Sequence, residues 1–356
     1  MFRKLFIQIC LLTFLISAAF SQSDYSPARN VSSSLLSSFR LFEDEEIIEI
    51  SLRFDMTAYF RDKSSESIKA EITINSGKPD SITRKIKLKT RGVFRKKYCE
   101  FPPIELNFKN ADFGYSDLDS ISKIKLVTQC GNGQDDEKYI LREYLVYKMF
   151  NVFTDTGFRV RLLRINYIDS EKERKPIRQY GFLIEPLELV AVRTNTIQIK
   201  TPKIGMRHIL PYTMDRLSIF NYMIGNYDWS VTGQHNVKVL KSLEHVTLQQ
   251  GIIIPYDFDW SGVVNAHYAI PAEDAGVKNV RERIFQGLCR EKEVFRKELD
   301  QFSENKDSIY RVINEFPHLK QRDKDDITRF LDEFFIRLKG NRDHIINDLI
   351  FNCKQN

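Results

Sequence analysis

The chain has 356 residues, of which 42% are hydrophobic and 29% are charged. This composition supplies enough apolar side chains for a packed core and excludes a disordered chain, while the length fits one large two-lobed unit or two domains. The formal net charge of +6 is small for this length, and no stretch interleaves basic and aromatic residues densely, which argues against a nucleic-acid partner.

Residues 1–21 are typical of a secretory signal peptide. Arg3 and Lys4 are basic, residues 5–16 are apolar, and small residues follow before Gln22. The apolar run is shorter than the roughly 20 residues of a membrane span, so we expect cleavage and no stable span, with a retained anchor helix as the alternative. The sequence therefore predicts an exported protein, found in the periplasm, at the cell surface or secreted.

Four cysteines remain after such cleavage, in a compartment that favours disulfides. Cys99, Cys130, Cys289 and Cys353 allow three pairings, among which the sequence does not choose. Their spacing lacks the paired cysteines or histidines of a zinc site. We therefore expect structural thiols or disulfides rather than a metal.

Residues 22–44 are rich in serine and are predicted as a linker. Short apolar or alternating runs separated by turn residues follow, and they predict a mostly antiparallel sheet. An amphipathic helix ending near residue 150 comes next, before two more strands. The strands are expected at 47–54, 68–74, 86–90, 104–108, 124–128, 160–168 and 180–185.

Past residue 205 the chain becomes more helical. The pattern predicts a helix over 215–225, a polar loop over 226–234, two short strands, at 237–240 and 252–254, and helices after about residue 278. The order of elements predicts an α+β fold. We expect a small β-rich lobe with one helix over 45–190, a larger helical lobe over 191–356, and a ligand cleft between them.

Polar side chains gather at the ends of elements in the second half of the chain. Asp228 lies in the loop after a helix, Asn236 precedes a strand, and Asp257 and Asp259 follow one. Phosphoryl transfer from a nucleotide needs a carboxylate near the attacking hydroxyl and oxygen ligands for Mg²⁺. These residues supply that set in the order of elements that protein kinases use.

Four short motifs resemble the CotH family of secreted atypical kinases and, more distantly, HipA-type kinases. In the family's order, they are Arg91-Gly92, Leu141-Arg142, Tyr180 to Glu185 and Pro255 to Asp259. The likeness covers roughly residues 45–265. It implies a bilobal protein-kinase-like fold and an enzyme that transfers phosphate from ATP, with Mg²⁺, to a hydroxyl on an exported protein or a surface glycan.

The resemblance also implies roles for individual residues. Asp228 would be the catalytic-loop carboxylate, and Asn236 and Asp257 would be the magnesium ligands. Asp259 could take or share the last role, because two carboxylates two positions apart on a strand face the same side.

On the nucleotide side, Lys125 is the favoured phosphate-binding residue and Glu143 its ion-pair partner, with Arg142 as the competitor. Glu185 would meet a purine. Arg91 and Gly92 would belong to the nucleotide-binding segment.

Two departures from the family pattern support an alternative function. No glycine-rich phosphate loop is present, and Phe101 to Glu105 stands where basic residues are expected. An inactive pseudokinase that binds a partner or ligand during envelope assembly is therefore the second hypothesis. In simpler interpretations, Asp228 and Asn236 only satisfy turn backbone, Lys125 and Glu143 are surface charges, and Glu185 ends a strand. The sequence does not give the acceptor or the oligomeric state.

Overall fold

The computed structural model describes residues 38–63, 66–131, 133, 136–200, 204–244, 250–273 and 276–355. The predicted signal peptide and most of the predicted linker lie outside these residues. The chain from Ser37 to Asn356 forms one compact unit.

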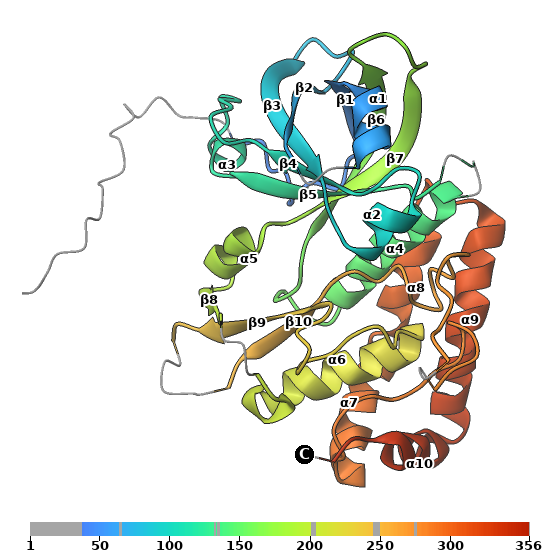
Figure 1. Ribbon diagram of the computed structural model, residues 1–356. Helices are drawn as coiled ribbons and strands as arrows, with labels where there is room; N and C mark the ends of the chain where they lie inside the picture. Colours follow the sequence, from blue (N-terminus) through green and yellow to red (C-terminus); the bar gives the residue numbers. More distant parts are fainter. Residues whose placement is uncertain are drawn as a thin grey trace, which may run out of the picture. The chain divides into compact units, whose positions relative to one another are not determined.

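Seven strands of this unit form a closed barrel (Figure 1). All neighbouring strands are antiparallel except one pair, which runs parallel from Ile48 opposite Leu163 to Phe54 opposite Asp169. This pair closes the barrel, so neither of its strands is left with an open edge. In barrel order the strands are β1 (Ile48–Phe54), β2 (Ile68–Ile74), β3 (Ile82–Thr90), β4 (Ile104–Asn107), β5 (Lys123–Thr128), β7 (Ile177–Ile184) and β6 (Val160–Asp169).

The alternation of apolar residues along these strands fills the barrel. In β1, Ile48, Ile50, Leu52 and Phe54 are buried, whereas the residues between them are at least partly exposed. Because successive side chains of a strand point to opposite faces, one row of each strand enters the barrel core.

Helices and a small sheet build a second core. In Figure 1 the barrel is drawn above and most of the helices after residue 205 lie below it. The helices are α1 (Met56–Asp62), α2 (Phe94–Tyr98), α3 (Ser116–Asp119), α4 (Glu137–Asn151), α5 (Leu187–Arg193), α6 (Pro211–Ile224), α7 (Lys292–Glu304), α8 (Lys306–Asn314), α9 (Gln321–Gly340) and α10 (Arg342–Asn352). The small sheet has the order β10 (Ile252–Pro255), β9 (Val237–Ser242) and β8 (Thr196–Gln198), and β10 contacts α6.

Helix α4 is the element shared by both parts. It packs against β6 and β7 on one side and α8 on another, so nearly every residue from Ile140 to Phe150 is buried. A helix that is surrounded in this way has little freedom to shift. Its side chains therefore have fixed positions relative to the barrel.

The structure corrects the predicted fold class. The prediction of a bilobal protein-kinase-like fold, with a small β-rich lobe and a larger α-rich lobe, is wrong: the strands close into a seven-stranded barrel within one unit of mixed α and β content. The reason is the parallel pairing of β1 with β6. These strands are far apart in the sequence, and alternation within a strand does not reveal its partner.

Two disulfides select one of the three pairings that the sequence allows. Cys99 pairs with Cys130, which joins the end of α2 to the residues after β5, and Cys289 pairs with Cys353, which joins the segment before α7 to the end of α10. The second link is reinforced by a hydrogen bond from the Cys289 N–H to the carbonyl oxygen of Lys354 at 3.0 Å. Within the described ranges, no helix has the length and apolar character needed to cross a membrane.

Removal of the disulfide between Cys289 and Cys353 should destabilise the protein. The two residues are 64 positions apart, and opening a loop of this length is expected to lower the free energy of unfolding by about 3 to 4 kcal/mol. Urea denaturation of the variant Cys289→Ser/Cys353→Ser should show this as a lower midpoint. The reductant-treated wild type should have a midpoint no higher than that of the variant. Equal midpoints of the oxidised wild type and the variant would contradict the prediction.

Candidate functional site

Three segments far apart in the sequence meet around one cavity of about 550 Å³. The first runs from the end of β3 through α2, the second is the loop between α6 and β9, and the third follows β10. This volume lies in the range of small-molecule binding pockets. The lining residues are Arg91, Gly92, Val93, Phe94, Arg95, Lys97, Pro103, Asp228, His235, Asn236, Asp257, Asp259 and Trp260.

Asp228 is held by the loop in which it lies. Helix α6 ends at Ile224 and is followed by Gly225, whose φ of 66° turns the chain. The Asp228 N–H donates to Asn226 Oδ1 at 3.1 Å. The Asp228 carboxylate accepts a hydrogen bond from Asn236 Nδ2 at 2.9 Å and lies 2.8 Å from His235 Nε2. Because Nδ2 of Asn236 is used in this way, the side-chain oxygen Oδ1 of Asn236 remains as a potential metal ligand.

Asp257 has an unusual backbone conformation that the core enforces. Its φ is 64°, and that of Asn236 is 53°. Residues other than glycine rarely adopt this left-handed conformation, and such residues cluster at functional sites. The buried Tyr147 of α4 accepts a hydrogen bond from the Asp257 N–H at 2.8 Å. Among the described residues, none donates a hydrogen bond to the Asp257 carboxylate, which therefore remains available to a ligand.

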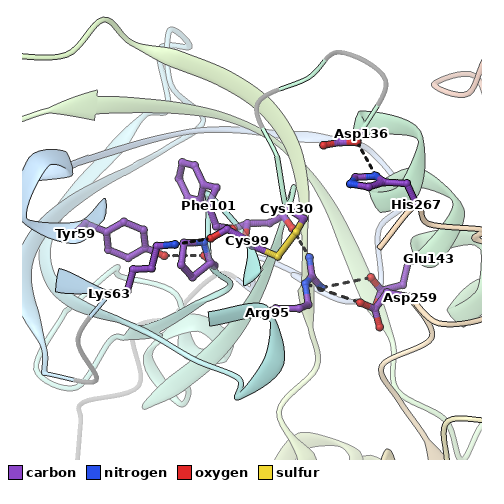
Figure 2. The surroundings of a disulfide bond; sticks show 12 residues. Tyr59, Lys63, Arg95, Cys99, Phe101, Cys130, Asp136, Glu143, Asp259 and His267 are labelled. Atoms are coloured by element: carbon purple, nitrogen blue, oxygen red, sulfur yellow. Dashed lines mark hydrogen bonds and ion pairs between the residues drawn. A yellow bond between two sulfur atoms is a disulfide. The ribbon is translucent and has the colours of Figure 1, made fainter. Parts of the chain in front are cut away.

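Arg95 points from α2 toward two buried carboxylates, those of Glu143 and Asp259 (Figure 2). Its Nη1 lies 3.8 Å from Glu143 Oε2, and its Nε lies 3.9 Å from Asp259 Oδ2. Its Nη2 donates to the Thr128 carbonyl oxygen at 2.6 Å. Glu143 Oε1 and Asp259 Oδ2 are buried without a hydrogen-bond partner. Such atoms are costly, by about 1 to 3 kcal/mol each, so a proton or a cation beside them would be stabilising.

The carboxylates of the cavity also perturb one another. Burial raises the pKa of Asp259 to about 7, and the charge of Asp257 raises it as well, whereas Arg95 opposes the rise. Burial and the charge of Asp259 hold the pKa of Glu143 well above its ordinary value. Burial likewise raises the pKa of Asp228. This crowding of negative charge would be relieved by a bound cation.

Positive side chains gather near Tyr256 and Asp257. The Nζ atoms of Lys125 on β5 and Lys238 on β9 lie 4.7 and 5.4 Å from the centre of the Tyr256 ring. Burial lowers the pKa of Lys125 to about 8, and the charges of Arg91 and Lys238 lower it further, while Asp257 opposes this effect. A bound anion would relieve the repulsion among these cations.

The cavity brings together most of the residues that the sequence predicts for the site. Arg91, Gly92, Asp228, Asn236, Asp257 and Asp259 all line it. Lys125 does not line the cavity but is near enough to Asp257 for their charges to interact. Glu143 does not line the cavity and lies within ion-pair distance of Arg95, which does.

Two other predicted site residues lie elsewhere. Arg142 forms ion pairs with Asp323 and Asp326 of α9, each at 2.9 Å. Glu185 accepts hydrogen bonds from Arg193 Nη2 at 2.8 Å and from the Arg159 N–H at 3.0 Å. Arg193 and Arg159 line a different cavity of about 550 Å³.

Arg95 lines the cavity but was not predicted from the sequence. It takes the place beside Glu143 that was expected for Lys125. The available signal was the basic run Arg95-Lys96-Lys97, shortly after Arg91-Gly92. Tyr147 and Lys238 were missed as well, because an aromatic residue in a helix and a lysine in a strand are common outside functional sites.

The donor set fits Mg²⁺ only if the ligand completes the coordination. In the part of the chain that the structure describes, no three histidine, cysteine, aspartate or glutamate side chains are grouped as a metal site by themselves. The oxygens available are the carboxylates of Asp257 and Asp259, including Asp259 Oδ2, which accepts no hydrogen bond from a described residue, and the side-chain oxygen of Asn236. Mg²⁺ is commonly held by one or two carboxylates together with substrate phosphates and water, and this set meets that requirement.

The raised pKa of Asp259 predicts that stability falls as the pH rises. An unfolded aspartate loses its proton near pH 4, whereas the folded protein keeps it up to about pH 7. Between these values the folded state binds more protons, so the free energy of unfolding decreases with increasing pH. Urea unfolding from about pH 5 to pH 8 should show a smaller decrease for Asp259→Asn than for wild type. Identical slopes would contradict the prediction.

The hydrogen bond from Asp257 to Tyr147 predicts a cost for Tyr147→Phe. The substitution leaves a backbone N–H without its acceptor, which should lower the free energy of unfolding by about 1 to 3 kcal/mol. The matched control is Tyr144→Phe, also buried on α4, whose hydroxyl has no hydrogen bond to any described residue. Urea denaturation should show the larger loss for Tyr147→Phe, and equal losses would exclude a specific role for this hydrogen bond.

Comparison with known proteins leaves the family open. No family model matches the chain, and no curated protein matches it in sequence. Among solved structures it is similar to a Helicobacter pylori proinflammatory kinase, CtkA, with a TM-score of 0.38 and 12% sequence identity over 70% of this chain and 90% of that chain. A likeness of this extent supports no conclusion about the activity. The resemblance of the motifs to the CotH family therefore stays a prediction.

Proposed function

We propose that the cavity binds a nucleoside triphosphate with Mg²⁺ and transfers its terminal phosphoryl group to a hydroxyl of an exported acceptor. The observation that carries the proposal is the meeting of two opposite charge clusters beside one cavity. The carboxylates of Asp257 and Asp259 lie close together, and Asp259 Oδ2 accepts no hydrogen bond from the described part of the chain. The cations Arg91 and Lys238 lie near Lys125, and the nearby carboxylates of Asp257 and Glu105 offset their effect on its pKa only in part. A metal–triphosphate complex carries both of the charges that would relieve this crowding.

Each of the two charge clusters would bind a different part of the metal–triphosphate complex. The cation would be held by the carboxylates of Asp257 and Asp259 and by the side-chain oxygen of Asn236. The phosphate oxygens would be contacted by Arg91 and Lys125. Bound Mg²⁺ would neutralise part of the negative charge on the phosphates. Arg95 would help to keep Asp259 in place, because it lies within ion-pair distance of both this residue and Glu143.

Asp228 would orient the acceptor hydroxyl. The bond between the hydroxyl oxygen and the terminal phosphorus forms as the bond from that phosphorus to the nucleoside diphosphate breaks, and the hydroxyl proton passes to the Asp228 carboxylate. Burial raises the pKa of Asp228 and so favours its acceptance of a proton. The exposed His235, 2.8 Å from Asp228 Oδ1, offers the proton a route to solvent.

Binding without turnover is the second candidate function. The specific observation in its favour is the ion pair of Glu143 with Arg95 instead of Lys125. An arginine that is held between two buried carboxylates is not available to contact a phosphate. The same cavity would then hold a nucleotide or another phosphate ligand as a structural or regulatory group.

The location outside the cytoplasm is part of the proposal. It is supported by the signal-like composition of residues 1–21 and by the pairing of all four cysteines downstream of it, because disulfides persist in oxidising compartments. An acceptor on an exported protein or a surface glycan is compatible with this location.

Thermal unfolding tests the binding step. Mg²⁺–ATP at about 100 times its Kd should stabilise the protein by about 2.7 kcal/mol, which raises the Tm by several degrees. Asp257→Asn should lose most of this rise while keeping the left-handed backbone, which asparagine tolerates. Lys125→Ala should weaken binding through the loss of a phosphate contact. The matched control is Asp343→Asn in α10, an exposed carboxylate far along the chain from the site, which should behave like wild type.

Transfer of label from γ-labelled ATP tests turnover. Asp228→Asn should lower the rate by about 100-fold or more and should leave the Mg²⁺–ATP-dependent rise in Tm in place. A rise in Tm without any transfer to protein or glycan fractions would favour binding without turnover. If no nucleotide raises the Tm of the wild type, the proposed function is wrong.

A further inference from the structure

The segment that forms one wall of the cavity has two different faces. Arg95 of α2 points inward and is buried. Val93, Phe94 and Tyr98 point outward, with 92%, 45% and 52% of their surfaces exposed. We call these three residues, together with Trp260, the aromatic rim.

The three rings of the aromatic rim form a connected group rather than a set of isolated residues. The Phe94 ring stacks on the Tyr98 ring with centroids 5.2 Å apart, and it meets the Trp260 ring edge to face at 5.4 Å. Tyr98 also approaches the buried ring of Tyr268 at 6.1 Å. Single exposed apolar residues are normal in soluble proteins, but a contiguous group beside a cavity is typical of an interaction site.

Helix α2 is held in place, so it cannot rotate to bury the aromatic rim. The Arg95 side chain fixes the inner face of this short helix, and Cys99 at its end is tied to Cys130. Figure 2 shows both restraints on the same segment. The outward side chains are therefore presented to solvent at the mouth of the cavity, where Val93, Phe94 and Trp260 also line it.

Charge and hydrogen-bonding chemistry indicate the kind of partner. Helix α2 carries Arg95, Lys96 and Lys97 and no acidic residue in its first turn, and Arg91 precedes it. Arg91 and the exposed Lys97 favour acidic groups on the partner, and the apolar surface of Val93 and Phe94 favours an apolar side chain over the hydroxyl groups of a neutral glycan. A polypeptide could pack a large apolar side chain on the aromatic rim and place carboxylates beside the positive charges near it.

We propose that the acceptor is a polypeptide segment in which the reacting hydroxyl residue is next to an aromatic or large aliphatic side chain and is flanked by acidic residues. The apolar side chain packs on the aromatic rim, the acidic residues face Arg91 and Lys97, and the hydroxyl enters the cavity toward Asp228. This inference rests on the proposed function, because it names the acceptor of the same site.

Peptide binding tests the inference. Three fluorescent twelve-residue peptides are compared by anisotropy in the presence of Mg²⁺ and a non-hydrolysable ATP analogue. The reference peptide has one serine followed by phenylalanine and three aspartates, the second has alanine for phenylalanine, and the third has lysine for each aspartate. We expect the second and third to bind at least about tenfold more weakly than the reference, the size of effect that the loss of one buried aromatic anchor produces.

Variants of the protein locate the binding surface. Tyr98→Ser, which is outside the cavity lining, should weaken the reference peptide by about fivefold or more and reduce the difference between the phenylalanine and alanine peptides. It should leave the Mg²⁺–ATP-dependent rise in Tm unchanged. The matched control is Phe351→Ser in α10, a residue that is 87% exposed and that should not affect peptide binding.

The outcomes separate this inference from the proposed function. If Mg²⁺–ATP raises the Tm but no peptide binds, or the three peptides bind equally well, the inference is overturned and the proposed function stands. Displacement of the reference peptide by a neutral oligosaccharide, or a loss of self-association in Tyr98→Ser, would also overturn it in favour of a glycan or a second copy of the chain. If the peptide preference is present but Mg²⁺–ATP does not bind, the proposed function fails and the aromatic rim remains a peptide-binding surface.

Discussion

The candidate site depends on the burial of one arginine between two carboxylates. Arg95 lies within ion-pair distance of both Glu143 and Asp259, and all three side chains are buried. Taking charges out of water is costly unless each is paired, and removal of one partner leaves the others uncompensated. The group therefore has to be assembled as a unit, and it joins α2, α4 and the segment after β10, which are far apart in the sequence.

This buried group leaves the neighbouring residues incompletely satisfied. One arginine offers a single positive charge to two carboxylates, and Asp257 adds a third negative charge nearby. Lys125 is near the cations Arg91 and Lys238, whose charges lower its pKa. A stable protein without a ligand would be expected to pair these groups, and their incomplete pairing is the observation on which the proposed binding of a metal–triphosphate rests.

Much of the local structure could be predicted from the sequence, because alternation and helical periodicity are local properties. β2 matches its predicted bounds, and β1, β4 and β5 differ by about one residue from theirs. The short helices α1, α2, α3 and α5 were missed, since a few residues give no clear periodicity, and residues 278–291, predicted as helical, precede α7. The closure of the barrel could not be predicted, since it depends on which distant strands pair.

The candidate site shows the same division. Asp228, Asn236, Asp257 and Asp259 were predicted because each is a polar residue at the end of an apolar element, and such ends meet in the fold. Arg142 and Glu185 were placed at the site because of their positions in short motifs, but their side chains form ion pairs elsewhere. Which face of a helix or strand turns toward a cavity is decided by packing. For that reason Arg95, rather than Lys125, pairs with Glu143.

The parallel pair of β1 and β6 has a consequence for how the chain acquires its structure. Strand β1 is among the first strands to be made, yet its partner is over a hundred residues further along. To bring such distant positions together, the chain loses much conformational entropy before the contacts between them form and stabilise the fold. Folds that depend on such contacts therefore form slowly. Until β6 arrives, one edge of β1 remains unpaired beside Ile48, Ile50 and Leu52, and an exposed apolar edge of this kind promotes aggregation. The N-terminal half of the chain is therefore at risk of aggregation until residue 169 is available.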